Sequence, residues 1–126
     1  PIPDPALDDR HGTRCAGQIL SIPNNGRCGV GVAHGAEVSA IRILSGKIST
    51  ADEAAAVIHR NDANAIYSCS WGPADDGQAL DGPASPVLAA FIRGLQEGRG
   101  GLGSVYVFAA GNGKSADNCN YDGYAN

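Results

Sequence analysis

The sequence lacks the features of several classes of protein. It has no run of about 18 apolar residues, so no membrane span is expected within this segment. The formal net charge of −4 is mild and predicts no nucleic-acid partner. Four cysteines are present, but the paired Cys and His spacings of a structural zinc site are missing. The function of this segment is therefore not expected to rest on a membrane span, a nucleic-acid surface or a structural zinc site.

A nucleotide-binding loop is absent as well. Gly113-Lys114-Ser115 follows an apolar run and imitates the end of a phosphate-binding loop. That motif requires a glycine five residues before Gly113, where this chain has Phe108. We therefore do not expect the loop to bind a nucleotide.

The chain has the size and pattern of an α/β domain. Its 126 residues, 43% of them hydrophobic, can bury a single core, and its 18 glycines suit many tight turns. Helical and strand patterns alternate, which is typical of a parallel sheet. The predicted helices are about 11–20, Thr50 to about Arg60, and Pro83 or Pro86 to the glycines around Arg99. The predicted strands are 37–44, 66–70 and 105–109. Thr50 and Glu53 have the spacing of a capping box, with Thr50 as N-cap.

His11 lies at the start of the first predicted helix. Apolar residues from Cys15 to Leu20 recur at spacings of three and four, which leaves the His11 ring free to face a cleft. A neutral imidazole is a good general base near physiological pH. A histidine in isolation more often has a structural or surface role, so this hypothesis requires partners.

Two apolar runs end in polar loops. The run from Val105 to Ala109 reaches Asn112, and we interpret it as a buried parallel strand that brings an amide to the carboxyl edge of a sheet. Such an amide can donate to an oxyanion in acyl transfer, although a plain Gly-Asn-Gly turn is an open alternative. The run from Ile66 leads to the carboxylates of Asp75 and Asp76, which could equally belong to a solvated turn.

Together these segments resemble the catalytic domain of subtilisin-like proprotein convertases of the kexin and furin branch. The motifs that carry the resemblance span nearly the whole chain: His11–Gly17, Cys28–Val32, Ser70–Pro73, Asp75–Gly77, Gly98–Gly100, Ala110–Gly113 and Asn118–Tyr124. Ser68–Ser70 and Cys119–Tyr121 look more like the fungal kexins. The resemblance implies a three-layer subtilisin-like fold, of which residues 1–126 are an internal fragment of one peptidase S8-type catalytic domain, truncated at both ends.

The resemblance also implies catalytic roles. His11 matches the general base of a Ser-His-Asp triad, and Asn112 matches the oxyanion donor. In the family the catalytic aspartate lies well before the histidine, and the nucleophilic serine lies in Gly-Thr-Ser-Ala. Neither is found in this sequence. We therefore expect the segment to be inactive alone.

Substrate-binding residues follow from the same resemblance. Carboxylates in a cleft pair with arginine and lysine side chains, although ordinary surface acids are the alternative. The implied set comprises Asp75 and Asp122 for the arginine before the cut, Asp8 for the neighbouring basic residue, Glu53, Asp81 and Tyr124 for a residue further out, and the cleft motif Ser70, Trp71 and Gly72.

The resemblance implies calcium as the cofactor, and both candidate sites offer the hard oxygen ligands that calcium needs. The first would use the side chain of Asn25 and the carbonyl groups of Ile22, Arg27 and Gly29. The second would use Asp75 and Asp117. We expect both sites to be incomplete within this segment.

The resemblance assigns the cysteines to two groups. Cys28 and Cys119 are each expected to pair with cysteines outside residues 1–126, as suits an oxidising compartment. Cys15 and Cys69 are expected to be reduced. Cys15 would pack behind His11, where a bulky thiol reagent would inhibit the intact enzyme.

The implied function is a calcium-dependent serine endopeptidase that cleaves secretory proproteins after paired basic residues. Its partners would be dibasic proproteins and its own propeptide, and it would work in the late Golgi or at the cell surface, with or without a membrane anchor. The alternative is a non-catalytic relative whose acidic cleft binds basic peptides. His11 and Asn112 favour the enzyme, since a binding module has no need of an oxyanion donor.

Overall fold

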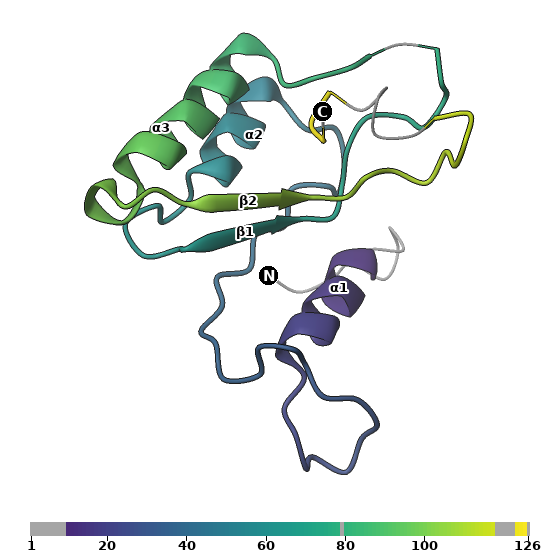
Figure 1. Ribbon diagram of the computed structural model, residues 1–126, viewed down its shortest axis with the longest axis vertical. Coiled ribbons are helices and arrows are strands. Elements are labelled where there is room, and N and C mark those ends of the chain that lie inside the picture. Colours follow the sequence, from purple (N-terminus) through teal and green to yellow (C-terminus); the bar gives the residue numbers. More distant parts are fainter. Residues whose placement is uncertain (1–9, 79, 118–122, 126) are drawn as a thin grey trace. The chain divides into compact units, whose positions relative to one another are not determined.

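The computed structural model describes residues 10–78, 80–117 and 123–125, which belong to two compact units (Figure 1). The first unit is Pro1–Lys47 and the second is Ile48–Asn126. No described helix is long and apolar enough to cross a membrane.

The first unit contains the predicted helix α1, His11–Leu20. Arg10 is its N-cap and makes no side-chain capping hydrogen bond. The helix ends at Ser21, whose N–H and hydroxyl both donate to the carbonyl oxygen of Gly17, at 3.0 and 2.6 Å. No residue of α1 is buried. Local hydrogen bonds therefore define this helix more than a core does.

A loop returns from the end of α1 and packs back against it. The N–H groups of Gly31 and Ala33 donate to the carbonyl oxygens of Ser21 and Ile19, both at 2.8 Å. A Cβ at position 31 would lie only 2.3 Å from the carbonyl oxygen of Ile19, so this close approach requires glycine.

The predicted strand 37–44 is wrong. This segment forms neither helix nor strand, and Val38 and Leu44 remain 63% and 54% exposed. Its apolar pattern indicates strand propensity, but a strand also needs a hydrogen-bonded neighbour. The sheet of the described residues has two strands and does not include this segment.

The second unit has the order α2 (Thr50–Val57), β1 (Ile66–Cys69), α3 (Ser85–Gly101) and β2 (Val105–Phe108). The strands β1 and β2 are parallel, with Ile66 opposite Val105 and Cys69 opposite Phe108. Parallel neighbours need a crossover, which α3 supplies. The chain is thus an α/β protein, as predicted, although two of the three expected strands form.

The N-cap of helix α2 lies one residue earlier than predicted. Ser49 is the N-cap: its hydroxyl accepts from the N–H of Asp52 at 3.1 Å, and its own N–H donates to the Asp52 carboxylate at 3.4 Å. The predicted capping box of Thr50 and Glu53 is therefore wrong. Ser49 and Asp52 have the same spacing one residue earlier, so spacing alone does not distinguish the two pairs. The helix also ends at Val57, before Arg60.

Helix α3 ends in glycines, as predicted. Regular helical geometry is lost at Gly98, and Arg99 and Gly100 have left-handed backbone angles, with φ of 51° and 67°. Its start is marked by Pro86, since proline fits the first turn of a helix.

The core of the second unit lies between the helices and one face of the sheet. Val57, Val87 and Ala90 form its buried centre, and Phe91 and Tyr106 pack against them. Figure 1 shows α2 and α3 on the same side of β1 and β2. The prediction of a buried final strand is wrong, because side chains alternate and those of the other face, such as Val105 and Val107, are each 52% exposed.

Candidate active site

The carboxyl ends of β1 and β2 meet at one edge of the sheet and continue into two polar loops. The first loop begins at Ser70, which is half-buried, and passes through the exposed Gly72 to Asp75. The second leads from Ala109 to Asn112 and Asp117. Because the strands are in register, the loops leave the sheet together; the N–H of Ala109 still donates to the carbonyl oxygen of Cys69 at 3.1 Å.

Asn112 and Asp75 are in direct contact between these loops. The backbone N–H of Asn112 donates to Oδ1 of Asp75 at 3.0 Å, and its side-chain amide lies 3.4 Å from Oδ2. Gly111 allows this approach: its φ is +80°, and a Cβ there would lie 2.5 Å from Oδ1 of Asp75. The structure thus brings together the predicted oxyanion donor and the predicted arginine-binding carboxylate, both exposed to solvent.

Asp117 is the second carboxylate of this loop region and is buried. Its Oδ2 accepts from the N–H of Gly77 at 2.6 Å, and Asp117 forms an isolated bridge with Gly113. Asp75 and Asp117 therefore both contact the Gly111–Gly113 loop. Their oxygen chemistry fits calcium. Within the described part of the chain, no three His, Cys, Asp or Glu side chains gather as a metal-ion group, so further ligands would be needed.

A second cluster joins α2 to the segment at Tyr124. The Tyr124 hydroxyl donates to Oε1 of Glu53, and the Trp71 ring packs edge-on against Tyr124 with centroids 5.2 Å apart. The exposed Asp81 lies beside them, since its carbonyl oxygen accepts from the N–H of Gly123 at 2.9 Å. Four of the predicted substrate-binding residues are thus neighbours.

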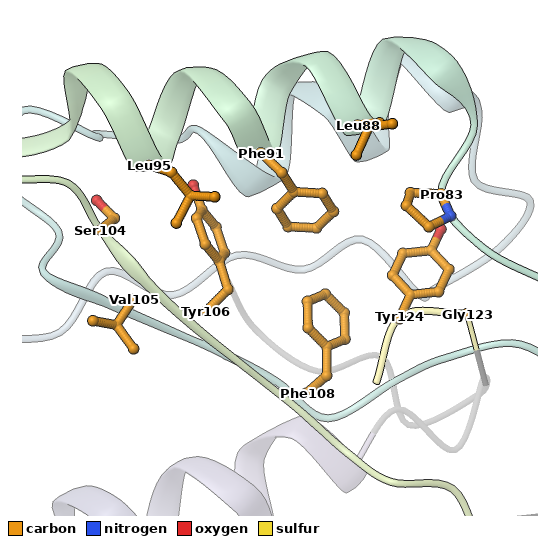
Figure 2. A pocket seen from close by; sticks show the side chains of 10 residues that line it. All are labelled: Pro83, Leu88, Phe91, Leu95, Ser104, Val105, Tyr106, Phe108, Gly123 and Tyr124. Atoms are coloured by element: carbon orange, nitrogen blue, oxygen red, sulfur yellow. The ribbon is translucent and has the colours of Figure 1, made fainter. Parts of the chain in front are cut away.

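Beside Tyr124 is an apolar groove of about 500 Å³ that the sequence did not predict. Figure 2 shows side chains from α3 and β2 around it, with Tyr124 at one end. The lining residues are Pro83, Leu88, Phe91, Leu95, Ser104, Val105, Tyr106, Phe108, Gly123 and Tyr124. None is charged, so the groove itself offers no ion pair to a basic side chain. The sequence signal for this groove was the spacing of Leu88 and Leu95, which puts both leucines on one face of α3.

His11 is the first residue of α1, in the other unit, and its side chain is exposed. Sγ of Cys15 lies 3.7 Å from its Nδ1 and 3.9 Å from its Nε2. Residues four apart lie on one helix face, which explains the contact. Cys15 therefore packs against His11 as expected.

The predicted calcium loop of the first unit is held by a local turn. The N–H of Arg27 donates to Oδ1 of Asn25 at 2.9 Å, and Gly26 and Gly29 have φ of 73° and 92°. Ile22 is 64% exposed. An amide oxygen has two lone pairs, so Oδ1 of Asn25 could also bind a cation. The donors suit calcium, but Ile22–Gly29 contains no carboxylate, so the charge would have to come from elsewhere.

Three cysteines are free thiols in the described structure: Cys15 is half-buried, Cys28 exposed and Cys69 buried. Burial raises the pKa of Cys69 to about 11. The expected pairing of Cys28 with a distant cysteine stays a prediction. Asp8, Asp122 and Cys119 lie outside the described residues, so their predicted roles are not addressed by the structure.

Comparison with known proteins decides the family. A profile described as the subtilase family matches residues 2–126, nearly the whole chain. The chain belongs to the subtilase family. The catalytic members of the subtilase family are serine endopeptidases. The α/β fold class of the family agrees with the parallel pairing of β1 and β2.

Within this family the chain is similar to proprotein convertases. It is 58% identical to kexin of Saccharomyces cerevisiae, 55% to kexin of Candida albicans and 52% to human furin, over 99%, 95% and 94% of its own length. These matches cover 16%, 13% and 15% of the three relatives, so the chain spans about a sixth of their length or less. The resemblance to the kexin and furin branch is confirmed.

Proposed function

We propose that this chain is part of a calcium-dependent serine endopeptidase that cleaves secretory proproteins after paired basic residues. The observation that carries the proposal is the contact between Asn112 and Asp75 at the carboxyl edge of the sheet. It puts an amide that can stabilise an oxyanion beside a carboxylate that can bind arginine, on two loops exposed to solvent.

In this proposal His11 takes the proton from a serine hydroxyl while the serine oxygen attacks the peptide carbonyl. The carbonyl π electrons move onto oxygen, and Asn112 donates a hydrogen bond to the resulting oxyanion. His11 then gives the proton to the leaving amine as the C–N bond breaks. The serine and the aspartate that orients His11 would come from other parts of the full-length protein.

Substrate selection would come from the acidic groups near the loops. Asp75, with Asp122, would pair with the arginine before the cut, and Asp8 with the basic residue preceding it. Glu53, Asp81 and Tyr124 would contact a residue further out. A bound guanidinium offers several donors in a planar fork, so carboxylates on adjacent loops suit it. The cleft motif Ser70, Trp71 and Gly72 would line the peptide.

Calcium would be held by Asn25 and the carbonyl groups of Ile22, Arg27 and Gly29, and by Asp75 and Asp117. It would supply positive charge that compensates carboxylates packed around the loops. The buried position of Asp117 supports such a role, because a buried carboxylate needs hydrogen-bond donors or a cation around it, and the N–H of Gly77 supplies one donor.

The similarity to kexin and furin supports a proposal for the partners and the location. Kexin and furin homologues indicate a processing protease of the secretory pathway. We propose dibasic proproteins and the protein's own propeptide as partners, and the late Golgi or cell surface as the place of action, with or without an anchor.

A non-catalytic peptide-binding relative is the second candidate. It is favoured by one observation: in the structure the side-chain amide of Asn112 faces Asp75, as it could in a site that only binds cations. Such a protein would bind a Lys-Arg peptide and leave it intact.

The deciding experiment measures kcat/KM of the full-length protein on a fluorogenic Lys-Arg peptide, with and without a calcium chelator. We expect cleavage that the chelator abolishes. His11→Ala should lower kcat by about 10⁴-fold or more, since it removes the general base. His34→Ala, at an exposed histidine of the same unit, is the control and should keep full activity. Binding of the peptide without cleavage by the wild-type protein would exclude the enzyme.

A further inference from the structure

We propose that Asp75 is a positioning residue for Asn112, so that one carboxylate couples recognition of arginine to stabilisation of the oxyanion. This inference rests on the proposed function and adds a second role to Asp75. It starts from the two hydrogen bonds between these residues, which no feature of the sequence predicted.

The two bonds differ in strength. The backbone N–H of Asn112 lies at a normal distance of 3.0 Å from Oδ1, whereas the side-chain nitrogen is 3.4 Å from Oδ2. Charge-assisted bonds of this kind are usually about 2.7–2.9 Å long. Asp75 therefore fixes the backbone of Asn112 firmly and holds its amide loosely.

The chemistry of a primary amide makes this contact compatible with catalysis. Nδ2 carries two hydrogens, so one can be donated to Asp75 while the other is available to an oxyanion. The contact also orients the group, because only the nitrogen side of the amide can face a carboxylate. The contact therefore holds the side-chain amide of Asn112 with its nitrogen, and not its oxygen, toward Asp75.

The charge of Asp75 explains why the coupling would depend on substrate. The part of the Asp75 charge that calcium does not offset opposes negative charge on a nearby oxyanion, since like charges repel. A substrate guanidinium bound to Asp75 removes that opposition. Arginine would then raise kcat as well as lower KM, which is binding energy expressed in the transition state.

Gly111 offers a second way to disturb the contact. A Cβ at this position would lie 2.5 Å from Oδ1 of Asp75, and the φ of +80° disfavours a side chain, so Gly111→Ala should displace the carboxylate, the loop backbone or both, and break the contact while leaving the charge in place. Asp76 supplies a matched control: it is the adjacent exposed acid, and its Oδ1 accepts from the N–H of Gln78 at 2.9 Å.

The test is a double-mutant cycle in the full-length protein with a Lys-Arg peptide and calcium in excess, because Asp75 is also a proposed calcium ligand. Asp75→Asn should raise KM and lower kcat by about tenfold, the loss expected for one charge-assisted hydrogen bond. In an Asn112→Ala background the same change should still raise KM but alter kcat by no more than about twofold, because the group it positions is gone. Asp76→Asn should leave both constants within about twofold of wild type.

An equal loss of kcat in both backgrounds would overturn the positioning role and leave the proposed protease intact. No cleavage by the wild-type protein would instead remove the protease and this role together. Thermal unfolding of each variant checks folding. If Asp75→Asn does not fold, Gly111→Ala replaces it in the cycle, with the same non-additive loss of kcat expected and an additive loss refuting the coupling.

Discussion

The two compact units hold their candidate functional groups in different ways. In the first unit, His11 lies on a helix with no buried residue, and its described side-chain contact is with Cys15 one turn later. In the second, Asp75 and Asn112 lie on loops that leave a parallel sheet packed against two helices. Local structure orients the histidine, whereas tertiary structure orients the amide and the carboxylate.

This difference predicts where a substitution acts. A change in the first unit should alter chemistry or accessibility with little effect on unfolding. A change in the core of the second unit should lower the free energy of unfolding, because Val57, Val87 and Ala90 lose contacts on several sides. Matched pairs of residues, one in each setting, can test the contrast.

The two thiols should show the largest difference. Cys69 is buried in β1, and its burial raises its pKa to about 11, so near pH 8 only about one molecule in a thousand carries the reactive thiolate. Cys15 is half-buried beside His11. We expect a small alkylating reagent to modify Cys15 at least about a hundredfold faster than Cys69 at pH 8. Peptide mass spectrometry over time measures both rates, and equal rates would refute the contrast.

The same shift predicts a pH dependence of stability. The pKa of Cys69 rises from its ordinary 9.0 to about 11 in the fold, so the folded state holds the thiol proton more tightly. The stability associated with this group is complete below about pH 9 and is lost as the pH rises through 11. Cys69→Ala should flatten that fall in a denaturation series between these pH values, and an unchanged fall would assign it to other groups.

A pair of valines compares the cores directly. Val87 is fully buried on α3, and Val32 in the first unit is 89% exposed. Val87→Ala should lower the free energy of unfolding by about 2 kcal/mol, because two methyl groups lose their packing and leave a cavity. Val32→Ala should change it by less than about 0.5 kcal/mol. Urea denaturation measures both, and similar losses would mean that the first unit also has a core around Val32.

The sequence predicted the elements with strong local signals. Helix α1 was predicted with its observed bounds, and β1 and β2 to within a residue or so of their ends, since apolar spacing and glycine punctuation act locally. It failed at residues 37–44, where the apolar pattern is present but no strand among the described residues pairs with it. Pairing is a property of the fold and cannot be found in one segment.

The candidate site shows the same limit. The residue types of Asp75 and Asn112 were identified from motifs, but their contact depends on the parallel register of β1 and β2, which brings two distant loops together. The contact of Glu53 with Tyr124 likewise joins α2 to a segment far along the chain. Motif spacing therefore found the groups, and only the structure showed which of them touch.

The start of α2 allows the finest comparison, both with α1 and with the sequence prediction. Ser49 caps α2 through its hydroxyl, whereas Arg10 at the start of α1 makes no such bond. Ser49→Ala should destabilise the protein by about 1 kcal/mol, because the N–H of Asp52 loses its acceptor. Thr50→Ala removes the residue that the sequence favoured as N-cap; since Thr50 lies inside the helix, where alanine has the higher propensity, the loss should be under about 0.5 kcal/mol or become a small gain. Urea denaturation of the two variants distinguishes the two N-cap positions. A larger loss of unfolding free energy for Thr50→Ala than for Ser49→Ala would mean that the helix begins where the sequence suggested and that Ser49 has no capping role.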